Sequence, residues 1–252
     1  MSKSVSAPFA AVVLAAGLGK RMNSDLPKVL HLALGRPLVV HVLEQIDPLK
    51  PRLTVVVVGH RASLVQEALR GREVVFAEQI PQLGTGHAVQ MAWSALREGP
   101  ETLLVLAGDM PLIRTATLKR LLERHEREAN GVTFLSGVLE DPSGYGRVIR
   151  DAAGGFVKIV EEKDATPAER AVAEVNSGIY CFSRDRLELA LGFLRADNRQ
   201  QEYYLTDTLS IIKGQGGRIG VEQASDSREL LGVNNPEQLA MVEEALRAWG
   251  AK

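Results

Sequence analysis

The sequence predicts an α/β fold in which a mostly parallel sheet is covered by helices on both faces. Short apolar runs alternate with amphipathic segments through the first half of the chain, as in repeated βα units. The length of 252 residues allows one or two domains. Apolar residues make up 45% and charged residues 24%, which are ordinary globular proportions. We expect residues 1–252 to form a single domain.

The elements of the first half follow from the spacing of apolar residues. Strands are expected where short apolar runs occur, at Phe9–Leu14, Leu53–Val58, Glu73–Phe76 and Leu103–Ala107. Helices are expected where apolar residues recur every three or four positions, at Pro37–Ile46, Ala62–Leu69 and Thr85–Leu96. The same spacing returns at Leu118, Leu121, Leu122 and His125, which predicts one further helix.

The second half becomes rich in strands and turns after Val132–Val138. Turn-forming residues bracket Tyr145–Arg150, which predicts one arm of a hairpin. We expect a β-rich lobe, at about residues 137–205, inserted into the single domain. A last helix is expected at 236–249, with Asn235 as its N-cap and Pro236 at its first position.

The composition excludes several classes of protein. The formal net charge of −1 disfavours a strongly basic nucleic-acid or membrane-surface binder. The chain lacks an apolar run of roughly 18 residues that would suggest a membrane span. Cys181 is the only cysteine, so no internal disulfide is possible and a cytoplasmic location is expected. A signal peptide built on Lys3 and residues 10–16 is a weaker alternative, because Pro8 interrupts it and cleavage would cut the first glycine motif.

The first glycine motif follows the strand expected at 9–14 and runs Leu14-Ala15-Ala16-Gly17-Leu18-Gly19-Lys20-Arg21-Met22. Its glycines permit a tight backbone path that points amide groups at a phosphate, and Arg21 and Lys28 add cationic donors. Met22 departs from a dinucleotide fingerprint, and Leu14 departs from a P-loop. The motif predicts a triphosphate cradle, with an ordinary βα turn as the alternative.

The second motif runs from Gln79 to His87 and includes Gln82, Gly84 and Thr85. It follows a strand and opens a helix, where free amide groups favour polar or anionic ligands. The Gln79 amide can both donate and accept, which matches the O4 and N3–H edge of uracil. Thr85 as a simple helix cap and His87 as a packing residue are the alternatives.

The third motif is an apolar strand that ends in Gly108-Asp109. Ligands of open α/β sheets bind beyond the carboxyl ends of the strands, where Asp109 would hold a hard cation that bridges phosphates. The alternative is that Asp109 forms a turn or caps a helix.

Together these residues resemble a known family. The motifs occur in one order: Leu14-Ala-Ala-Gly-x-Gly-x-Arg-Met with Pro27-Lys28, Gln79-x-x-Gln82-Leu-Gly-Thr-Gly-His, Gly108-Asp109, Gly144-Tyr145-Gly146-Arg147, Ile159-Val160-Glu161, Glu174-Val175-Asn176-Ser177-Gly178, Glu202-Tyr203-Tyr204-Leu205-Thr206-Asp207 and Gly232-Val233-Asn234. Over about residues 8–248, the chain resembles the uridyltransferase domain of the bacterial bifunctional N-acetylglucosamine-1-phosphate uridyltransferase/glucosamine-1-phosphate acetyltransferases. The resemblance implies a Rossmann-like sheet of the nucleotide-diphospho-sugar transferase type with a sugar-binding lobe.

The resemblance also implies roles for particular residues. Those implied to bind the nucleotide are Leu14, Ala15, Ala16, Gly17, Gly19, Lys28, Gln79, Gln82, Gly84, Thr85 and Gly108. Those implied to bind the sugar are Gly146, Glu161, Asn176, Tyr204 and Thr206. Asp109 and Asn234 would share Mg²⁺, and Arg21, Lys28 and Asp109 would form the catalytic set.

The implied activity is Mg²⁺-dependent transfer of UMP from UTP to a sugar 1-phosphate, N-acetylglucosamine 1-phosphate, for cell-envelope precursor synthesis. The family's left-handed β-helix is not expected, because the sequence stops at Lys252, just after the helix that would lead into it, and no hexapeptide repeat follows that helix. Acetyltransferase activity is therefore not expected, and a monomer or weak oligomer is. Lys20, Ala107 and Ser177 depart from residues common in the family, which leaves substrate preference open.

Two other readings stay open. The chain could use another nucleotide or sugar 1-phosphate, or it could bind a nucleotide sugar without catalysis. A NAD-dependent dehydrogenase is disfavoured by Met22.

Overall fold

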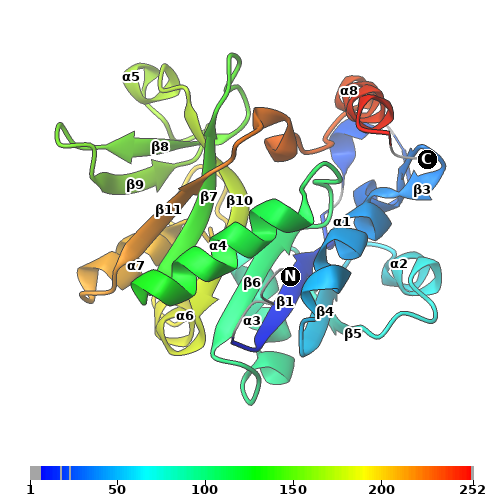
Figure 1. Ribbon diagram of the computed structural model, residues 1–252, viewed down its shortest axis with the longest axis horizontal. Helices are drawn as coiled ribbons and strands as arrows, with labels where there is room; N and C mark the ends of the chain where they lie inside the picture. Colours follow the sequence, from blue (N-terminus) through cyan, green and yellow to red (C-terminus); the bar gives the residue numbers. More distant parts are fainter. Residues whose placement is uncertain (1–6, 18, 23, 251–252) are drawn as a thin grey trace.

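Three parallel strands form the middle of the sheet in the computed structural model, which describes residues 7–17, 19–22 and 24–250 (Figure 1). β1 (Phe9–Leu14) lies between β4 (Leu53–Val58) and β6 (Thr102–Ala107) and is parallel to both. Their side chains are almost all buried, since a parallel sheet with two covered faces needs apolar residues on both sides of each strand.

The whole sheet is mixed, with the order β11-β7-β10-β6-β1-β4-β5. The outer strands are β5 (Val75–Glu78), β7 (Val132–Val138), β10 (Glu174–Ser183) and β11 (Ile219–Gln223). Only β10 runs antiparallel to its neighbours along this path. The expected mostly parallel α/β fold is therefore confirmed.

β10 belongs to both the main sheet and the β-rich part of the chain. Its last residues pair with β6, whereas Val175 and Asn176 pair with β8 (Gly146–Arg150). The pairing with β7 is interrupted by a bulge between Asn176 and Tyr180. β8 pairs in turn with β9 (Phe156–Val160), and the short helix α5 (Pro167–Arg170) follows.

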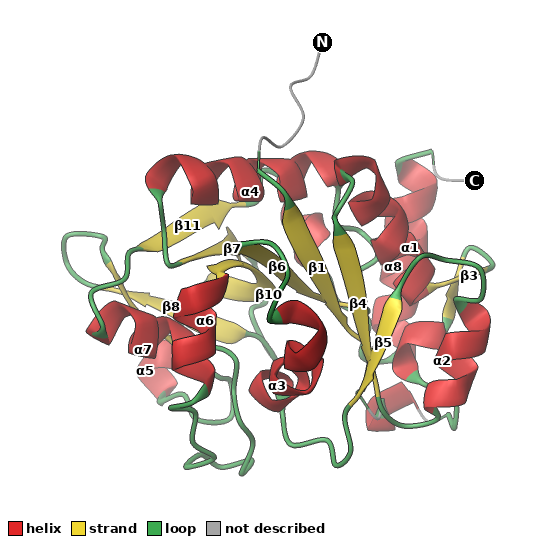
Figure 2. Ribbon diagram, turned by 90° about the horizontal axis from the view of Figure 1, so that it is seen from below, coloured by secondary structure: helices red, strands yellow, loops and turns green. Residues whose placement is uncertain are grey.

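Helices cover both faces of the sheet, as Figure 2 shows. One core lies under α1 (Leu38–Ile46), α2 (Ala62–Ala68) and α4 (Thr115–Glu128). The other lies under α3 (Thr85–Leu96), α6 (Arg184–Leu191) and α7 (Asp207–Gly214). Alternate residues of β1 face the two cores, because successive side chains of a strand point to opposite sides.

The last helix, α8 (Pro236–Ala248), covers a third, smaller core. Asn235 is its N-cap, as expected, and accepts a hydrogen bond from the backbone N–H of Gln238. Val242 and Leu246 pack there with Met22, the last residue of the 3-10 helix η1 (Lys20–Met22). α8 therefore supports the end of the first glycine motif.

The remaining elements are short. They are the 3-10 helices η2 (Lys28–Leu30), η3 (Asp47–Leu49) and η4 (Ser227–Leu230), and the two-stranded sheet of β2 (Leu32–Ala33) and β3 (Arg36–Pro37).

Most boundaries in the first half agree with the prediction, but that of β5 was wrong. The strand was expected at Glu73–Phe76 and lies at Val75–Glu78, because its register is set by pairing with Val55–Val58 of β4. Among the strands and α-helices of the second half, β9, β10, β11, α5, α6 and α7 were not predicted. Leu18 of the glycine motif and Lys3 lie outside the described residues.

Candidate active site

Two neighbouring hollows open where β1, β5 and β6 end. The larger has a volume of about 420 Å³ and the smaller about 300 Å³. Leu14, Thr85, Ala107 and Asp109 line both. Asp109 therefore lies where a ligand in one hollow would meet a ligand in the other.

The larger hollow collects the residues expected to hold the nucleotide. All of those residues line it except Ala15 and Gly108. These two are behind it, where the Ala15 N–H donates to the Val57 carbonyl and the Gly108 N–H donates to the Leu14 carbonyl. Gly19 has a φ of +61°, and a Cβ there would lie 2.9 Å from the Cβ of Lys28. Only glycine allows the loop to pass this close to Lys28.

The smaller hollow collects the residues expected to hold the sugar. Gly146, Glu161, Asn176 and Thr206 line it. Tyr204 does not: its buried hydroxyl donates to Asp164 (3.1 Å) and accepts from Gln200 (2.8 Å). Tyr204 therefore braces the neighbouring loops.

Four residues expected to act on phosphates and metal meet between the hollows. The Lys28 ammonium forms an ion pair with Asp109 and donates to Asn234 Oδ1 at 3.0 Å. Arg21 donates to the same Asn234 oxygen at 2.9 Å. Residues more than 200 positions apart in sequence are thus joined in one polar cluster. Asp109 does not cap α4, whose N-cap position is Arg114.

The Asn234 segment is fixed by its backbone. The Val233 N–H donates to the Asp109 carbonyl at 2.9 Å, and the Asn234 N–H donates to the Gln238 side chain at 2.8 Å. Asp109 and Asn234 are therefore held together by main-chain contacts as well as by Lys28.

The donor set suits a magnesium ion. Carboxylate and amide oxygens are hard ligands of the kind Mg²⁺ prefers, and here Asp109 and Asn234 each present one to the same ammonium. The described residues contain no group of three or more His, Cys, Asp or Glu that could enclose a metal by themselves. A site of two protein oxygens leaves the other positions for water and phosphate, which is the usual arrangement for Mg²⁺ beside a nucleotide.

Gln79 is deeply buried at the end of the larger hollow. Its Nε2 donates to the Gly84 carbonyl at 2.8 Å and lies 3.2 Å from His87 Nδ1. Burial lowers the pKa of His87, which favours the neutral imidazole. His87 thus contacts Gln79 and lines neither hollow.

Thr85 does not cap α3. The N-cap position is Gly84, and Thr85 Oγ1 accepts instead from the Leu205 N–H at 3.0 Å. This bond joins the start of α3 to the segment that carries Thr206.

Glu161 is the enclosed carboxyl group of the smaller hollow. Burial raises its pKa, and the charges of Asp207, Asp164 and Glu202 raise it further. The Thr206 hydroxyl donates to Glu161 Oε1 at 2.9 Å and acts in the opposite direction. This part of the site therefore offers a carboxyl that holds its proton to a higher pH than an exposed glutamate.

Several residues that line the hollows were not among the expected site residues. Ala107 and Glu202 line the larger one, and Tyr145 and Gly232 line the smaller one. Each belongs to or adjoins a quoted motif, so the signal was present. The Tyr145 hydroxyl donates to the Leu230 carbonyl at 3.2 Å, which ties the Gly144–Arg147 turn to the segment that leads to Asn234.

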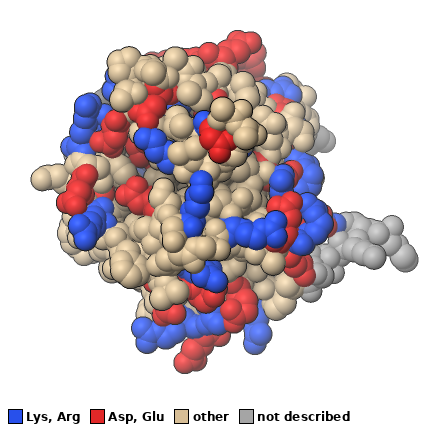
Figure 3. Space-filling model, turned by 90° about the vertical axis from the view of Figure 1, so that its left-hand side faces the viewer, with Lys and Arg blue, Asp and Glu red and all other residues tan. Residues whose placement is uncertain are grey.

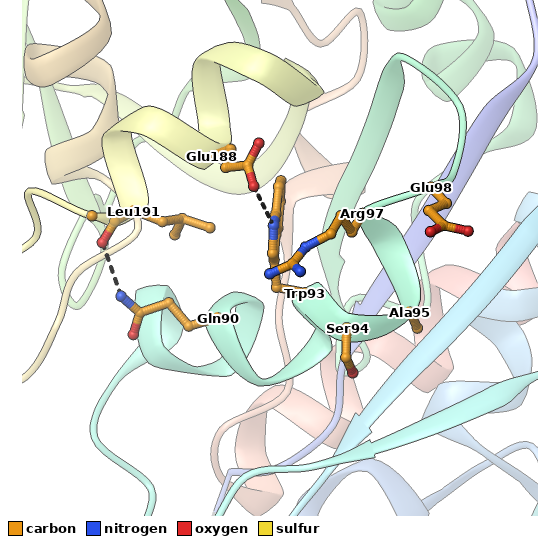
Figure 4. Close-up of a pocket in the computed structure, with 9 residues that line it drawn as sticks. Gln90, Trp93, Ser94, Ala95, Arg97, Glu98, Glu188 and Leu191 are labelled. Atoms are coloured by element: carbon orange, nitrogen blue, oxygen red, sulfur yellow. Dashed lines mark hydrogen bonds between the residues drawn. The ribbon is translucent and has the colours of Figure 1, made fainter.

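A third hollow, of about 800 Å³, is larger but has a different character (Figure 4). It lies between the C-terminal half of α3 and α6, and none of the expected site residues lines it. Trp93 donates to Glu188 at 3.0 Å, and Gln90 donates to the Leu191 carbonyl at 2.9 Å. These polar groups already bind α3 to α6, so the two smaller hollows are the candidate active site.

The surface shows no single-sign field on the face drawn in Figure 3, where acidic and basic side chains are interspersed. Within the described ranges, no helix is both long and apolar enough to cross a bilayer.

The fold and the site define a nucleotidyltransferase. The chain belongs to the family of the MobA-like NTP transferase domain, whose model matches residues 11–157.

More specific relatives are bacterial proteins named Bifunctional protein GlmU. That of Caldanaerobacter subterraneus subsp. tengcongensis is 49% identical over 237 residues, which are 94% of this chain and 51% of the relative. That of Bordetella parapertussis is 50% identical over 242 residues, which are 94% of this chain and 52% of the relative. The resemblance inferred from the motifs is confirmed, and the chain spans about half the length of these curated relatives.

A solved structure supports the fold. A crystal structure assigned to a glucose-1-phosphate thymidylyltransferase of Bacillus anthracis has a TM-score of 0.76, with 95% of each chain covered. The sequence identity is 16%, so this similarity bears on the fold alone.

Proposed function

We propose that this chain transfers UMP from UTP to N-acetylglucosamine 1-phosphate and releases pyrophosphate. The observation that carries the proposal is the cluster of Arg21, Lys28, Asp109 and Asn234 between two adjacent hollows. Two phosphorylated substrates would meet at this cluster, UTP from the larger hollow and the sugar phosphate from the smaller. The product would serve cell-envelope precursor synthesis in the cytoplasm.

The reaction needs no general base. A phosphate monoester with a second pKa near 6 is mostly dianionic at pH 7. One of its oxygens attacks the α-phosphorus of UTP in line, so that a new P–O bond forms as the bond to the β-phosphate breaks. Pyrophosphate leaves with the electron pair of that bond. The proposed residues therefore need not include a nucleophilic side chain or a general base.

The protein's part is to position and neutralise two anions. The Arg21 guanidinium and Lys28 ammonium would oppose the charge on the phosphates, and the Gly17–Gly19 loop would hold the triphosphate. Mg²⁺, held by Asp109 and Asn234, would supply Lewis-acid stabilisation of the charge on the phosphate oxygens. Glu161, Asn176 and Thr206 would orient the sugar.

A different nucleotide or sugar phosphate is the second candidate, since the polar groups of Glu161, Asn176 and Thr206 can bond the hydroxyl groups of several sugars. The test is a panel of pyrophosphate-release assays over four nucleoside triphosphates and several sugar 1-phosphates. The proposal expects the highest kcat/KM for UTP with N-acetylglucosamine 1-phosphate. Binding of UDP-N-acetylglucosamine without any Mg²⁺-dependent turnover would instead identify a non-catalytic binding protein.

Asp109→Ala is the decisive variant. It should lower kcat by about two orders of magnitude or more, since charge stabilisation at the reacting phosphate is typically worth that much. The Asp109 side chain contributes to the site and not to an apolar core, so we expect the circular dichroism spectrum and melting temperature to stay near those of the wild type. Near-normal turnover would contradict the role of Asp109.

A further inference from the structure

The orientation of the Gln79 amide is set by two acceptors. Its nitrogen carries two hydrogens, and both have partners here: the Gly84 carbonyl at 2.8 Å and His87 Nδ1 at 3.2 Å. A carbonyl oxygen can only accept, so the Gly84 contact requires the amide nitrogen on that side. The same donor fixes the His87 tautomer, with Nδ1 unprotonated.

The amide oxygen is left for a ligand. Among the described residues, none donates a hydrogen bond to Gln79 Oε1. This oxygen is also not fully buried, since it is absent from the set of buried side-chain atoms that lack a partner. Gln79 lines the larger hollow, so this oxygen opens onto it. Its role toward a base is therefore to accept a hydrogen bond.

We propose that His87 is a positioning residue that holds the Gln79 carbonyl oxygen toward the nucleotide, so that the site selects a pyrimidine whose N3 carries a hydrogen. Uracil has such a hydrogen, whereas N3 of cytosine is itself an acceptor and would face an oxygen across the contact. A buried acceptor without a donor costs binding free energy, so this one contact would favour uracil over cytosine. This inference rests on the proposed function, because it assigns a base to the larger hollow.

His87 acts without touching the reacting atoms. It is the third residue of α3, and the backbone of that turn is fixed independently, since the Gly86 N–H donates to the Tyr203 carbonyl at 2.7 Å. Loss of the imidazole should therefore leave the Gly84 carbonyl as the single acceptor that orients the Gln79 amide, and should hold the amide oxygen less firmly without moving the helix.

The test compares His87→Ala, His87→Asn and a control, Gln90→Ala. Asparagine at position 87 offers a side-chain oxygen near the place of Nδ1 and should keep the Gln79 amide oriented. The control removes one side-chain hydrogen bond from the same helix, away from both hollows. For each protein we would measure kcat/KM with UTP and with CTP, and the affinities for UDP and CDP by calorimetry.

His87→Ala should narrow the UTP to CTP ratio of kcat/KM about tenfold, the order expected for one buried hydrogen bond. The change should lie mainly in KM for UTP, with kcat little altered. His87→Asn should retain most of the ratio, and Gln90→Ala should leave it unchanged. An unaltered ratio in His87→Ala, an equal change in Gln90→Ala, or no rescue by His87→Asn would each overturn the inference.

The calorimetry separates this inference from the proposed reaction. A preference for UDP over CDP that His87→Ala weakens would support the inference even if the wild-type chain released no pyrophosphate. Equal affinity for UDP and CDP in the wild type would overturn it even if UTP turned over.

Discussion

The contacts that Lys28 makes in the structure conflict with the role proposed for it in the reaction. In the structure its ammonium contacts the oxygens of Asp109 and Asn234, the pair proposed to hold Mg²⁺. In the proposed reaction the same ammonium would neutralise the triphosphate. If both proposals hold, Lys28 would compete with the metal for these two oxygens until a nucleotide drew the ammonium away.

Lys28→Met should separate these roles. Turnover should fall by about two orders of magnitude, since a charge at the phosphates is lost. The affinity for Mn²⁺ without nucleotide, measured by electron paramagnetic resonance, should increase about threefold or more, because the ammonium that contacts both oxygens is removed. A tenfold increase would correspond to about 1.4 kcal/mol. Lys158→Met, which breaks the Lys158–Glu169 ion pair in the β-rich part, is the control. A weaker Mn²⁺ affinity in Lys28→Met would contradict the competition.

The free energy of unfolding should depend on pH through Glu161. Burial raises its pKa in the folded protein above the unfolded value, so the folded state binds the proton more tightly. Stability therefore falls as the pH rises from the unfolded pKa through the folded one, and the penalty stays in place above that range.

Glu161→Gln should remove this penalty. The melting temperature of the variant should exceed that of the wild type at pH 8, and the difference should shrink at pH 4, where the carboxyl is protonated in both states. Thermal unfolding at the two pH values measures the effect. A difference of the same size at both would show that the charge of Glu161 is not its cause.

At the scale of elements, the loop from Gln79 to Gly86 is built against a distant segment. The Tyr203 N–H donates to the Leu83 carbonyl at 2.8 Å, and the Tyr203 carbonyl accepts from Gly86. Gly84 has a φ of +105°, and a Cβ there would lie 2.7 Å from the Tyr203 carbonyl oxygen. The Gly84 end of the larger hollow therefore depends on a glycine for two reasons, backbone conformation and close approach.

Comparison of Gly84→Ala with Gly71→Ala should separate the cost of backbone conformation from the cost of close approach. Gly71 also has a positive φ, of +86°, but a Cβ there meets nothing within 4 Å. Gly71→Ala should cost about 1 kcal/mol of unfolding free energy from backbone strain alone. Gly84→Ala should cost more and should raise KM for UTP several-fold, because residues 202–203 must move. Chemical denaturation and initial rates test this, and equal costs in the two variants would argue against the close approach.

The sequence predicts the elements whose local pattern agrees with their place in the fold. β1 and β4 are apolar throughout and buried on both faces, so their bounds could be read directly. β5 is a partly exposed edge strand, so its ends are set by pairing with β4 and not by its own apolar run. β10 carries Asn176 and Gly178 inside a strand, and these residues resemble a turn until its bulge is seen.

The site was predictable to a similar degree. Motifs that follow strands placed Asp109 and Gln79 at one edge of the sheet, since the carboxyl ends of parallel strands lie together. Two features could not be foreseen: the hydrogen bond that the Leu205 N–H donates to Thr85, and the absence of Tyr204 from the lining of the smaller hollow. Both depend on how chain segments far apart in sequence pack.

For the whole molecule, stability should depend on pH through a histidine in the core. His125 of α4 is buried, with Nδ1 3.1 Å from the Thr133 hydroxyl and Nε2 3.4 Å from the Ser183 hydroxyl. Burial lowers its pKa from 6.5 to about 4, so the folded state prefers the neutral ring. The stabilisation is complete above pH 6.5 and is lost as the pH falls from 6.5 toward 4.

The size of this effect follows from the pKa difference and is about 3 kcal/mol. His125→Gln keeps hydrogen-bonding groups but cannot gain the proton, so its free energy of unfolding should vary less between pH 6.5 and 4. Urea titrations at a series of pH values would measure this. Parallel pH profiles for the two proteins would contradict the assignment.

The two tryptophans of the chain occupy separate places, one beside α6 and the other at the end of α8. Trp93 donates to Glu188, and the Trp249 ring lies 3.7 Å beneath the Arg114 guanidinium. Each is thus a natural fluorophore for its own region, and replacing one with phenylalanine leaves the emission of the other. Fluorescence from Trp249 would then report on α8, which bonds Asn234 through Gln238, and fluorescence from Trp93 on the contact between α3 and α6, without any added label.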